Sequence, residues 1–78
     1  MIINLDFMVN IFKEALELED YEVQLDSEFE NVPGWDSLGH MRIITEIEEK
    51  LNLEFDIDEI VGVDTIQKLI EMTKNKMK

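Results

Sequence analysis

Apolar residues that recur at steps of three and four positions are the feature that most limits what this chain can fold into. From about Asn4 to Leu18, the recurring apolar positions are Met8, Ile11, Phe12, Ala15 and Leu18. This spacing places them on one side of an α-helix. Either Asn4 or Asp6 can cap the start of that helix, because a short polar side chain accepts hydrogen bonds from the free N–H groups of a first turn.

A second helical run begins at Asp36 or Ser37 and ends near Leu51, with Asn52 as its expected stop. The apolar residues that we expect to face the core are Leu38, Met41, Ile44, Ile47 and Leu51. The opposite, polar face is expected to carry Arg42, Thr45, Glu46, Glu48 and Glu49. Asp36 is well suited as the N-cap, because its carboxylate accepts from free N–H groups and faces the positive end of the helix dipole.

A short element follows the second helix. The stretch Leu53-Glu54-Phe55 alternates like a strand, but the sequence offers it no partner strand. Asp56 or Asp58 then caps a short turn through residues 60–61, which Gly62 ends. We therefore expect one short helix here.

The last helix is expected from Thr65 to about Lys76, with Asp64 as its cap. Its expected buried positions are Ile66, Leu69, Ile70 and Thr73. Together these segments predict an all-α fold, a small four-helix bundle with three longer helices and one short one.

The segment 19–35 between the first two helices has no helical period, is acidic and contains the helix-breaking pair Pro33-Gly34. A loop of this length inside a small domain needs something to hold it. We expect its spaced apolar side chains to pack across the bundle, together with a short helical turn near Glu28. These side chains are Val23, Leu25, Phe29 and Val32.

Size and charge restrict the function. The chain has 78 residues, which fits one domain over 1–78, and it has no cysteine for a disulfide or thiolate metal site. Its 19 acidic and 7 basic residues give a net charge of −12. This charge excludes a protein that binds along the phosphate backbone of nucleic acids, and it favours partners with basic patches.

The sequence has no apolar run long enough for a membrane span and no signal peptide. We therefore expect a cytoplasmic monomer.

Metal binding is not expected. Asp56, Asp58 and Glu59 lie close together, but they lack the 12-residue loop of a calcium-binding EF-hand with its central glycine and final glutamate.

Ser37 is the candidate functional residue. A hydroxyl in the first turn of a helix lies near N–H groups that lack intrahelical partners, and a phosphate on that oxygen is favoured by them and by the helix dipole. Gly39 leaves room beside it. Position alone permits such a modified serine without requiring it, because serine is also common near helix starts for structural reasons.

The stretch that opens the second helix resembles the phosphopantetheine attachment region of the acyl carrier protein family. It reads Gly34-Trp35-Asp36-Ser37-Leu38, followed by Met41, Ile43-Ile44 and Glu46-Ile47-Glu48-Glu49. The resemblance covers nearly the whole chain, because the four expected helices and the long loop with Phe29 occur at the spacing of that family. An Asp-Ser-Leu tripeptide alone is weak evidence, but within a small, very acidic four-helix chain it is specific.

The resemblance implies a carrier that catalyses no reaction itself. Ser37 would receive 4′-phosphopantetheine from coenzyme A through a phosphopantetheinyl transferase. The thiol of this arm would hold an acyl, aminoacyl or polyketide group as a thioester and present it to acyl-loading and acyl-processing enzymes. Residues that would line a cargo space between the second helix and the last two are Met41, Ile44, Ile60 and Met72. For any single one of them, ordinary core packing is the favoured interpretation.

Some positions depart from the commonest pattern of the family. Fatty-acid carriers usually have an acidic start of the second helix, whereas Gly39, His40 and Arg42 occupy it here. Trp35 before the Asp-Ser-Leu resembles carriers of specialised pathways for polyketides, peptides, D-alanine or polysaccharide modification. Arg42 either contributes to a mixed-charge docking surface or pairs with Glu46 at i+4.

Parts of the sequence are also compatible with two other functions. Asp36, Ser37 and His40 are residue types of a hydrolase triad, which needs its serine, histidine and acid side chains aligned in a row. Side chains of neighbours on one helix point in different directions, so these three are not expected to align. His40 is expected at the surface or only partly covered. An acidic helical interaction module without a prosthetic group fits the charge and the helices equally well, and only the surroundings of Ser37 favour the carrier over it.

Overall fold

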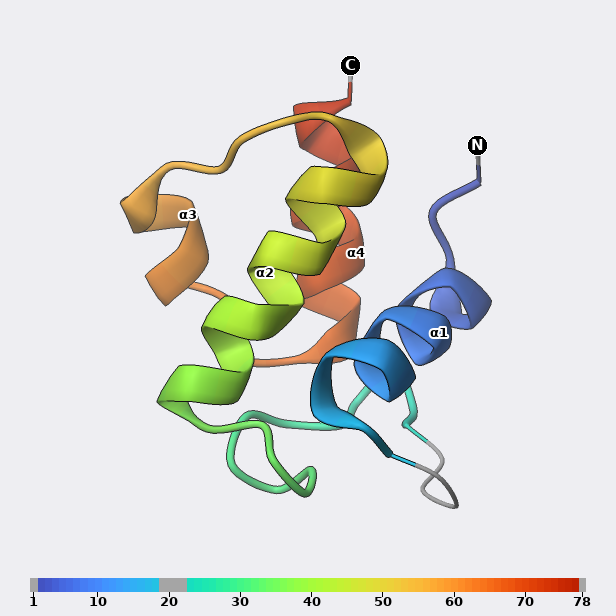
Figure 1. Cartoon of the computed structure of the whole chain (residues 1–78). Helices are drawn as coiled ribbons and strands as arrows, with labels where there is room; N and C mark the ends of the chain where they lie inside the picture. Colours follow the sequence, from blue (N-terminus) through green and yellow to red (C-terminus); the bar gives the residue numbers. More distant parts are fainter. Residues whose placement is uncertain (1, 19–22, 78) are drawn as a thin grey trace.

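The computed structural model describes residues 2–18 and 23–77 and is all-helical over these ranges (Figure 1). The helices are α1 (Leu5–Leu16), α2 (Ser37–Leu51), α3 (Ile57–Val61) and α4 (Ile66–Lys76). No strand forms within the described residues, where the one β-type pairing is an isolated bridge between Glu28 and Thr65. The predicted bundle of three longer helices and one short helix is therefore confirmed.

Helix α1 has the predicted cap and the predicted buried side. The Asn4 side chain accepts a hydrogen bond from the Phe7 N–H at 3.0 Å. Its buried residues are Met8, Ile11, Phe12 and Ala15. The helix ends earlier than predicted, because Glu17 adopts the left-handed conformation (φ 55°) that commonly stops a helix, and Leu18 beyond it is only half-buried.

Helix α2 begins and ends as predicted but turns a different side to the core. Its buried residues are Gly39, His40, Ile43, Ile44 and Ile47. Leu38 and Met41, both predicted to be buried, are 65% and 45% exposed. The reason is geometric: with 3.6 residues per turn, each step of three falls short of a full turn by about 60°, so Leu38 lies about 180° around the helix from Ile47.

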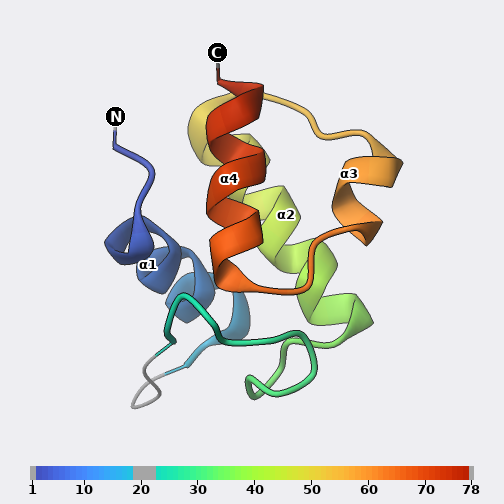
Figure 2. The same cartoon turned by 180° about the vertical axis from the view of Figure 1, so that it is seen from behind.

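Helix α3 starts after Asp56, one of the two predicted caps, and Gly62 follows its last residue. The Asp56 N–H donates to the Glu59 side chain at 2.8 Å. Helix α3 lies on the side of α2 away from α1, as both views show (Figure 1, Figure 2). The first and last residues of α3, Ile57 and Val61, are exposed, whereas Ile60 is buried.

The cap of α4 differs from the prediction by one residue. Thr65 accepts a hydrogen bond from the Lys68 N–H at 3.2 Å and is the N-cap. Asp64, predicted for that role, pairs instead with the Lys68 ammonium group at 3.0 Å. The predicted buried positions of this helix are all buried, and Met72 joins them.

The loop between α1 and α2 is held by buried side chains and by backbone hydrogen bonds to the start of α4. Val23 and Val32 are buried as predicted and Phe29 is half-buried, but Leu25 is 45% exposed. Leu25 instead contributes a backbone hydrogen bond, in which its carbonyl accepts from the N–H of Gln67 at 2.9 Å. Near Glu28 the chain makes a single hydrogen-bonded turn, in which the Asn31 N–H donates to the Glu28 carbonyl at 3.0 Å, and not a helix; Glu28 also pairs with Thr65 in the isolated bridge.

None of the helices in the described part of the chain is long and apolar enough to cross a membrane.

Candidate functional site

Ser37 is the first residue of α2, and its side chain is exposed. Asp36 before it is the N-cap, and its Oδ1 accepts from the Gly39 N–H at 2.9 Å. Residues 37–40 of the first turn carry no acidic side chain, so the Asp36 carboxylate at the N-cap is the acid next to Ser37 in the sequence. The hydroxyl therefore faces solvent at the positive end of a 15-residue helix.

Two glycines let the backbone before Ser37 lie directly against α2. A Cβ atom on Gly39 would fall 1.8 Å from the Gly34 carbonyl oxygen and 2.9 Å from Leu16. Gly34 itself has φ +82°, a conformation that L-residues rarely adopt. The turn that presents Ser37 therefore depends on both glycines.

Trp35 anchors this turn in the core. Its side chain is 1% exposed and meets Phe12 of α1 edge to face at a ring distance of 4.8 Å, with Phe29 of the loop at 6.1 Å. Its backbone N–H donates to Val32 and its carbonyl accepts from Glu30. Because Trp35 lies two residues before Ser37, the serine is fixed relative to α1 and the loop.

His40 is buried, with 8% exposure, so the prediction of a surface or partly covered residue was wrong. Its Nδ1 lies 3.0 Å from Trp35 Nε1, and its Nε2 lies 2.9 Å from the carbonyl oxygen of Ile60. An indole N–H can only donate, so Nδ1 must accept and Nε2 carries the proton. The sequence signal that was missed is a tryptophan directly before a helix cap with a histidine five residues later.

These contacts also exclude a hydrolase triad. Both ring nitrogens of His40 are occupied by Trp35 and Ile60, so neither is available to take a proton from Ser37. Asp36 is engaged in capping.

An apolar pocket of about 350 Å³ opens beside Ser37, between α2, α3 and the loop. Its lining residues are Phe29, Ser37, His40, Met41, Ile57, Ile60, Val61, Val63 and Asp64. Of the four predicted cargo-lining residues, Met41 and Ile60 line this pocket. Ile44 and Met72 are buried in the core and do not line it.

Comparison with known proteins gives the family. The profile described as "Phosphopantetheine attachment site" matches residues 6–73. Acyl carrier protein 3 of Ralstonia nicotianae is 33% identical over 66 residues, which cover 85% of this chain and 76% of that protein. The acyl carrier protein of Buchnera aphidicola is 30% identical over 66 residues, which cover 85% of this chain and 82% of that one. The chain belongs to the acyl carrier protein family.

The fold of this carrier agrees with a solved member of the family. The solution NMR structure of holo acyl carrier protein from Geobacter metallireducens superposes with a TM-score of 0.85 over 97% of this chain and 87% of that one, at 21% identity. Acyl carrier proteins are carriers and not enzymes, and their prosthetic group is covalently attached phosphopantetheine. Membership thus favours the carrier over an interaction module without a prosthetic group.

The residues around Ser37 fit such a group. The serine hydroxyl is exposed, the helix start favours a phosphate, and the adjoining pocket offers apolar walls for whatever an arm carries. In the described part of the chain, no cluster of three or more histidine, aspartate or glutamate side chains is placed to hold a metal ion.

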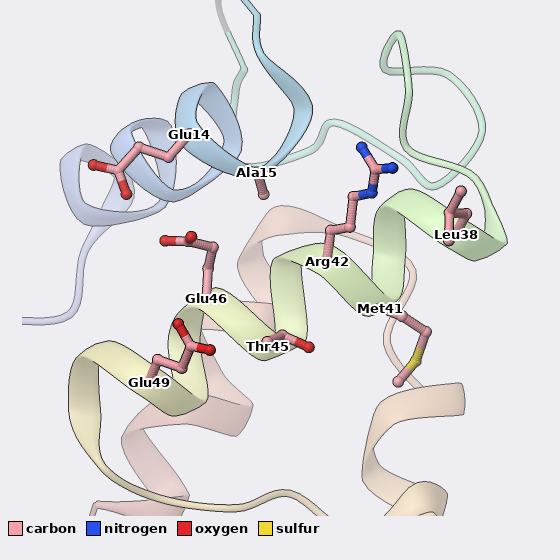
Figure 3. Close-up of a pocket in the computed structure, with 8 residues that line it drawn as sticks. All are labelled: Glu14, Ala15, Leu38, Met41, Arg42, Thr45, Glu46 and Glu49. Atoms are coloured by element: carbon pink, nitrogen blue, oxygen red, sulfur yellow. The ribbon is translucent and has the colours of Figure 1, made fainter.

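A second surface hollow of this carrier lies between α1 and α2 and contains mixed charges (Figure 3). Its lining residues are Glu14, Ala15, Leu38, Met41, Arg42, Thr45, Glu46 and Glu49. Arg42 extends along it toward α1, whereas Met41 points toward α3 (Figure 3). The alternative ion pair of Arg42 with Glu46 does not form among the described residues, where Lys50 is the partner of Glu14 at 3.2 Å.

Glu46 faces Glu14 instead of Arg42 (Figure 3). Partial burial and the neighbouring Glu14 carboxylate raise the pKa of Glu46 above its usual value. Hydrogen bonds from Lys50 and from Glu46 lower the pKa of Glu14. Glu14 and Glu46 therefore titrate as an interacting pair, and among the described residues no carboxylate lies within ion-pair distance of Arg42.

Proposed function

We propose that Ser37 is the residue that carries phosphopantetheine in this acyl carrier protein. The observation that supports it most is the placement of Ser37, with an exposed hydroxyl at the start of α2 beside an apolar pocket. The chain has one other serine, Ser27, whose hydroxyl already accepts a hydrogen bond from the Gln24 N–H at 2.8 Å within the loop. Ser37 is therefore the better placed of the two.

The chain supplies position and shelter, and the attached group supplies the thiol that holds an acyl group as a thioester. Asp36 and the two glycines keep Ser37 at the tip of α2. Met41 and Ile60 lie in the pocket walls next to it. Because Met41 is unbranched and adaptable, it suits cargo of variable shape.

The partners of this carrier are a phosphopantetheinyl transferase and acyl-loading and acyl-processing enzymes, which it meets as a monomer in the cytoplasm. Its pathway is a specialised one rather than housekeeping fatty acid synthesis. This proposal is supported by the absence of acids from the first turn of α2 and by the exposed apolar and cationic residues that follow Ser37. A partner surface that faces Leu38, Met41 and Arg42 needs apolar groups and an acid, in addition to basic groups for the acids further along α2.

The test is the intact mass of the purified protein after incubation with coenzyme A and a broad-specificity phosphopantetheinyl transferase. The wild type and Ser27→Ala are expected to gain the mass of one arm, and Ser37→Ala is expected to gain none while keeping its helical circular dichroism. A gain by Ser37→Ala, or no gain by a wild type incubated with a transferase that modifies a control carrier, would contradict the proposal.

A further inference from the structure

A single buried histidine connects three parts of the molecule around the pocket. His40 on α2 accepts from Trp35 of the attachment turn and donates to the carbonyl of Ile60 on α3. Its ring is stacked near Trp35 at 6.2 Å and meets Phe29 edge to face at 5.7 Å. The imidazole thus lies beside two aromatic rings and is hydrogen-bonded at both nitrogens.

The bond to Ile60 joins α3 to α2. The Ile60 carbonyl also accepts from the Gly62 N–H and, at 3.5 Å, from the Val63 N–H, so His40 adds a donor from another helix to a carbonyl that already has local donors. The carbonyl of Ile60 lies near the C-terminal end of α3, and the His40 Nε2–H reaches it across the interface at 2.9 Å. Apart from the buried Ile60 side chain, the apolar residues of α3 are exposed, so polar contacts help to fix its place: this bond to α2 and the Lys76 ion pair with Glu59 to α4.

The position of α3 determines the shape of the pocket. The buried lining residues His40 and Ile60 form its floor, and the exposed Ile57 and Val61 form its rim on the α3 side. A shift of α3 away from α2 would therefore open the floor and the rim together.

We propose that His40 is a positioning residue that holds α3 against α2 beside Ser37, and that it does so as the tautomer with the proton on Nε2, which the hydrogen bond from Trp35 selects. If the proton moved to Nδ1, that atom would face the indole N–H, and Nε2 could no longer donate to Ile60. Trp35 therefore controls α3 through His40, although it does not itself line the pocket.

The titratable surroundings of His40 are sparse. From the loop it faces Phe29 and Trp35, and from α3 it faces the Ile60 carbonyl, none of which titrates. The one acidic side chain among the described lining residues of the pocket is Asp64, which is paired with Lys68. Among the described residues, the hydrogen-bond partners of the His40 ring are thus the Trp35 indole and the Ile60 carbonyl, and neither is a carboxylate.

The first experiment reads the tautomer directly in the unmodified, ¹⁵N-labelled protein, which contains one histidine. Near neutral pH, the ring nitrogen shifts are expected to show an unprotonated Nδ1 and a protonated Nε2. In Trp35→Phe, which removes the indole N–H but keeps an aromatic ring, the preference is expected to weaken. A wild-type ring protonated on Nδ1, or one that is unaffected in Trp35→Phe, would overturn the proposal.

The second experiment measures amide hydrogen exchange of α3 at Ile60 and Val61. His40→Leu is expected to accelerate exchange there about tenfold relative to the core of α2, the size of one lost hydrogen bond. His40→Gln should restore most of the protection, because one amide can accept from Trp35 and donate to Ile60. Equal exchange in wild type and His40→Leu, or no rescue by glutamine, would overturn it.

Thr73→Val is the matched control for general loss of stability. It removes another buried polar contact, from the Thr73 hydroxyl to the Leu69 carbonyl at 2.8 Å, but lies within α4. It should leave exchange at α3 unchanged relative to the core. Both experiments use the protein without its arm, so their failure would leave the mass test of Ser37 untouched, and failure of that test would leave the tautomer result standing.

Discussion

The turn that presents Ser37 and the short helix α3 form two sides of one pocket, yet they are held in different ways. Residues 34–40 are fixed by backbone contact between two glycines and by a tryptophan buried among rings from α1 and the loop. Residues 57–61 of α3 leave Ile57 66% and Val61 73% exposed. Their links to the rest include Ile60, the His40 hydrogen bond and the Lys76 ion pair with Glu59 at 2.7 Å.

The difference suits a carrier. An attachment residue must stand in one defined place for every partner enzyme, so its turn is built from tight packing, which has few alternative arrangements. A wall that meets variable cargo gains from being held by a few polar contacts, which open at low cost. The predictions below test this contrast between a tightly packed turn and a lightly held helix.

The largest expected effect is that of Trp35→Ala on the turn. Removing a fully buried tryptophan should lower the free energy of unfolding by about 3–5 kcal/mol, measured by chemical denaturation. The control Leu38→Ala, at a residue 65% exposed on the same turn, should change it by less than about 0.5 kcal/mol. Similar losses in both variants would mean that the turn is not anchored by its tryptophan.

Gly39→Ala should have the next largest effect. Its Cβ would meet the Gly34 carbonyl at 1.8 Å, so backbone must move, at a cost of about 1–3 kcal/mol in unfolding free energy. The matched control is Gly62→Ala at the end of α3, where a Cβ would meet no atom closer than 3.4 Å and φ is −84°. That variant should be near neutral in the same assay, and a reversed order of the two would contradict the account.

Acid should loosen α3 before it affects the turn. The hydrogen bond from Lys76, with that from the Asp56 N–H, holds the pKa of Glu59 below its usual value of 4.5. A lowered folded-state pKa means that this stabilisation is present above pH 4.5 and is lost as the pH falls through the lowered value.

Protection factors of α3 amides should therefore fall on acidification below that pH, ahead of those in the core of α2. In Lys76→Met the early loss of protection should become smaller, because the pairing with Lys76 is already absent and the Asp56 N–H bond to Glu59 remains. The fall would have another cause if that variant kept the wild-type acid response.

The smallest effect is that of salt. With a net charge of −12, screening should raise the melting temperature by relieving self-repulsion. The same salt weakens the partly exposed pairing of Lys76 with Glu59, so exchange at α3 should quicken slightly while the whole protein becomes more stable. A falling melting temperature across a sodium chloride titration would contradict this prediction.

Much of the fold could be predicted from local patterns. Helix α1, the Asp36 cap and the buried side of α4 follow from spacing and capping chemistry, which act within one element. The side of α2 that faces the core could not be predicted from apolar residues spaced three apart. Such residues shift around the helix from one to the next, so two sides of α2 are apolar, and the elements packed against α2 decide which side is buried. Ser37 stood out because its motif is local.

The role of His40 was hidden for the opposite reason. Its partners are Trp35, five residues before it, and the Ile60 carbonyl, twenty residues after it. A backbone carbonyl has no signature in a sequence. The exposure of Leu25 has the same origin, since its segment is held to α4 by backbone hydrogen bonds and not by its side chain.

Fragmentation mass spectrometry of the protein purified from its own host tests the central claim most directly, because it reads both the group and the residue that bears it. We predict a phosphopantetheine arm on Ser37 and on no other residue. An arm mapped to Ser27 or to a threonine, or a protein isolated without any arm from cells with an active transferase, would contradict the account.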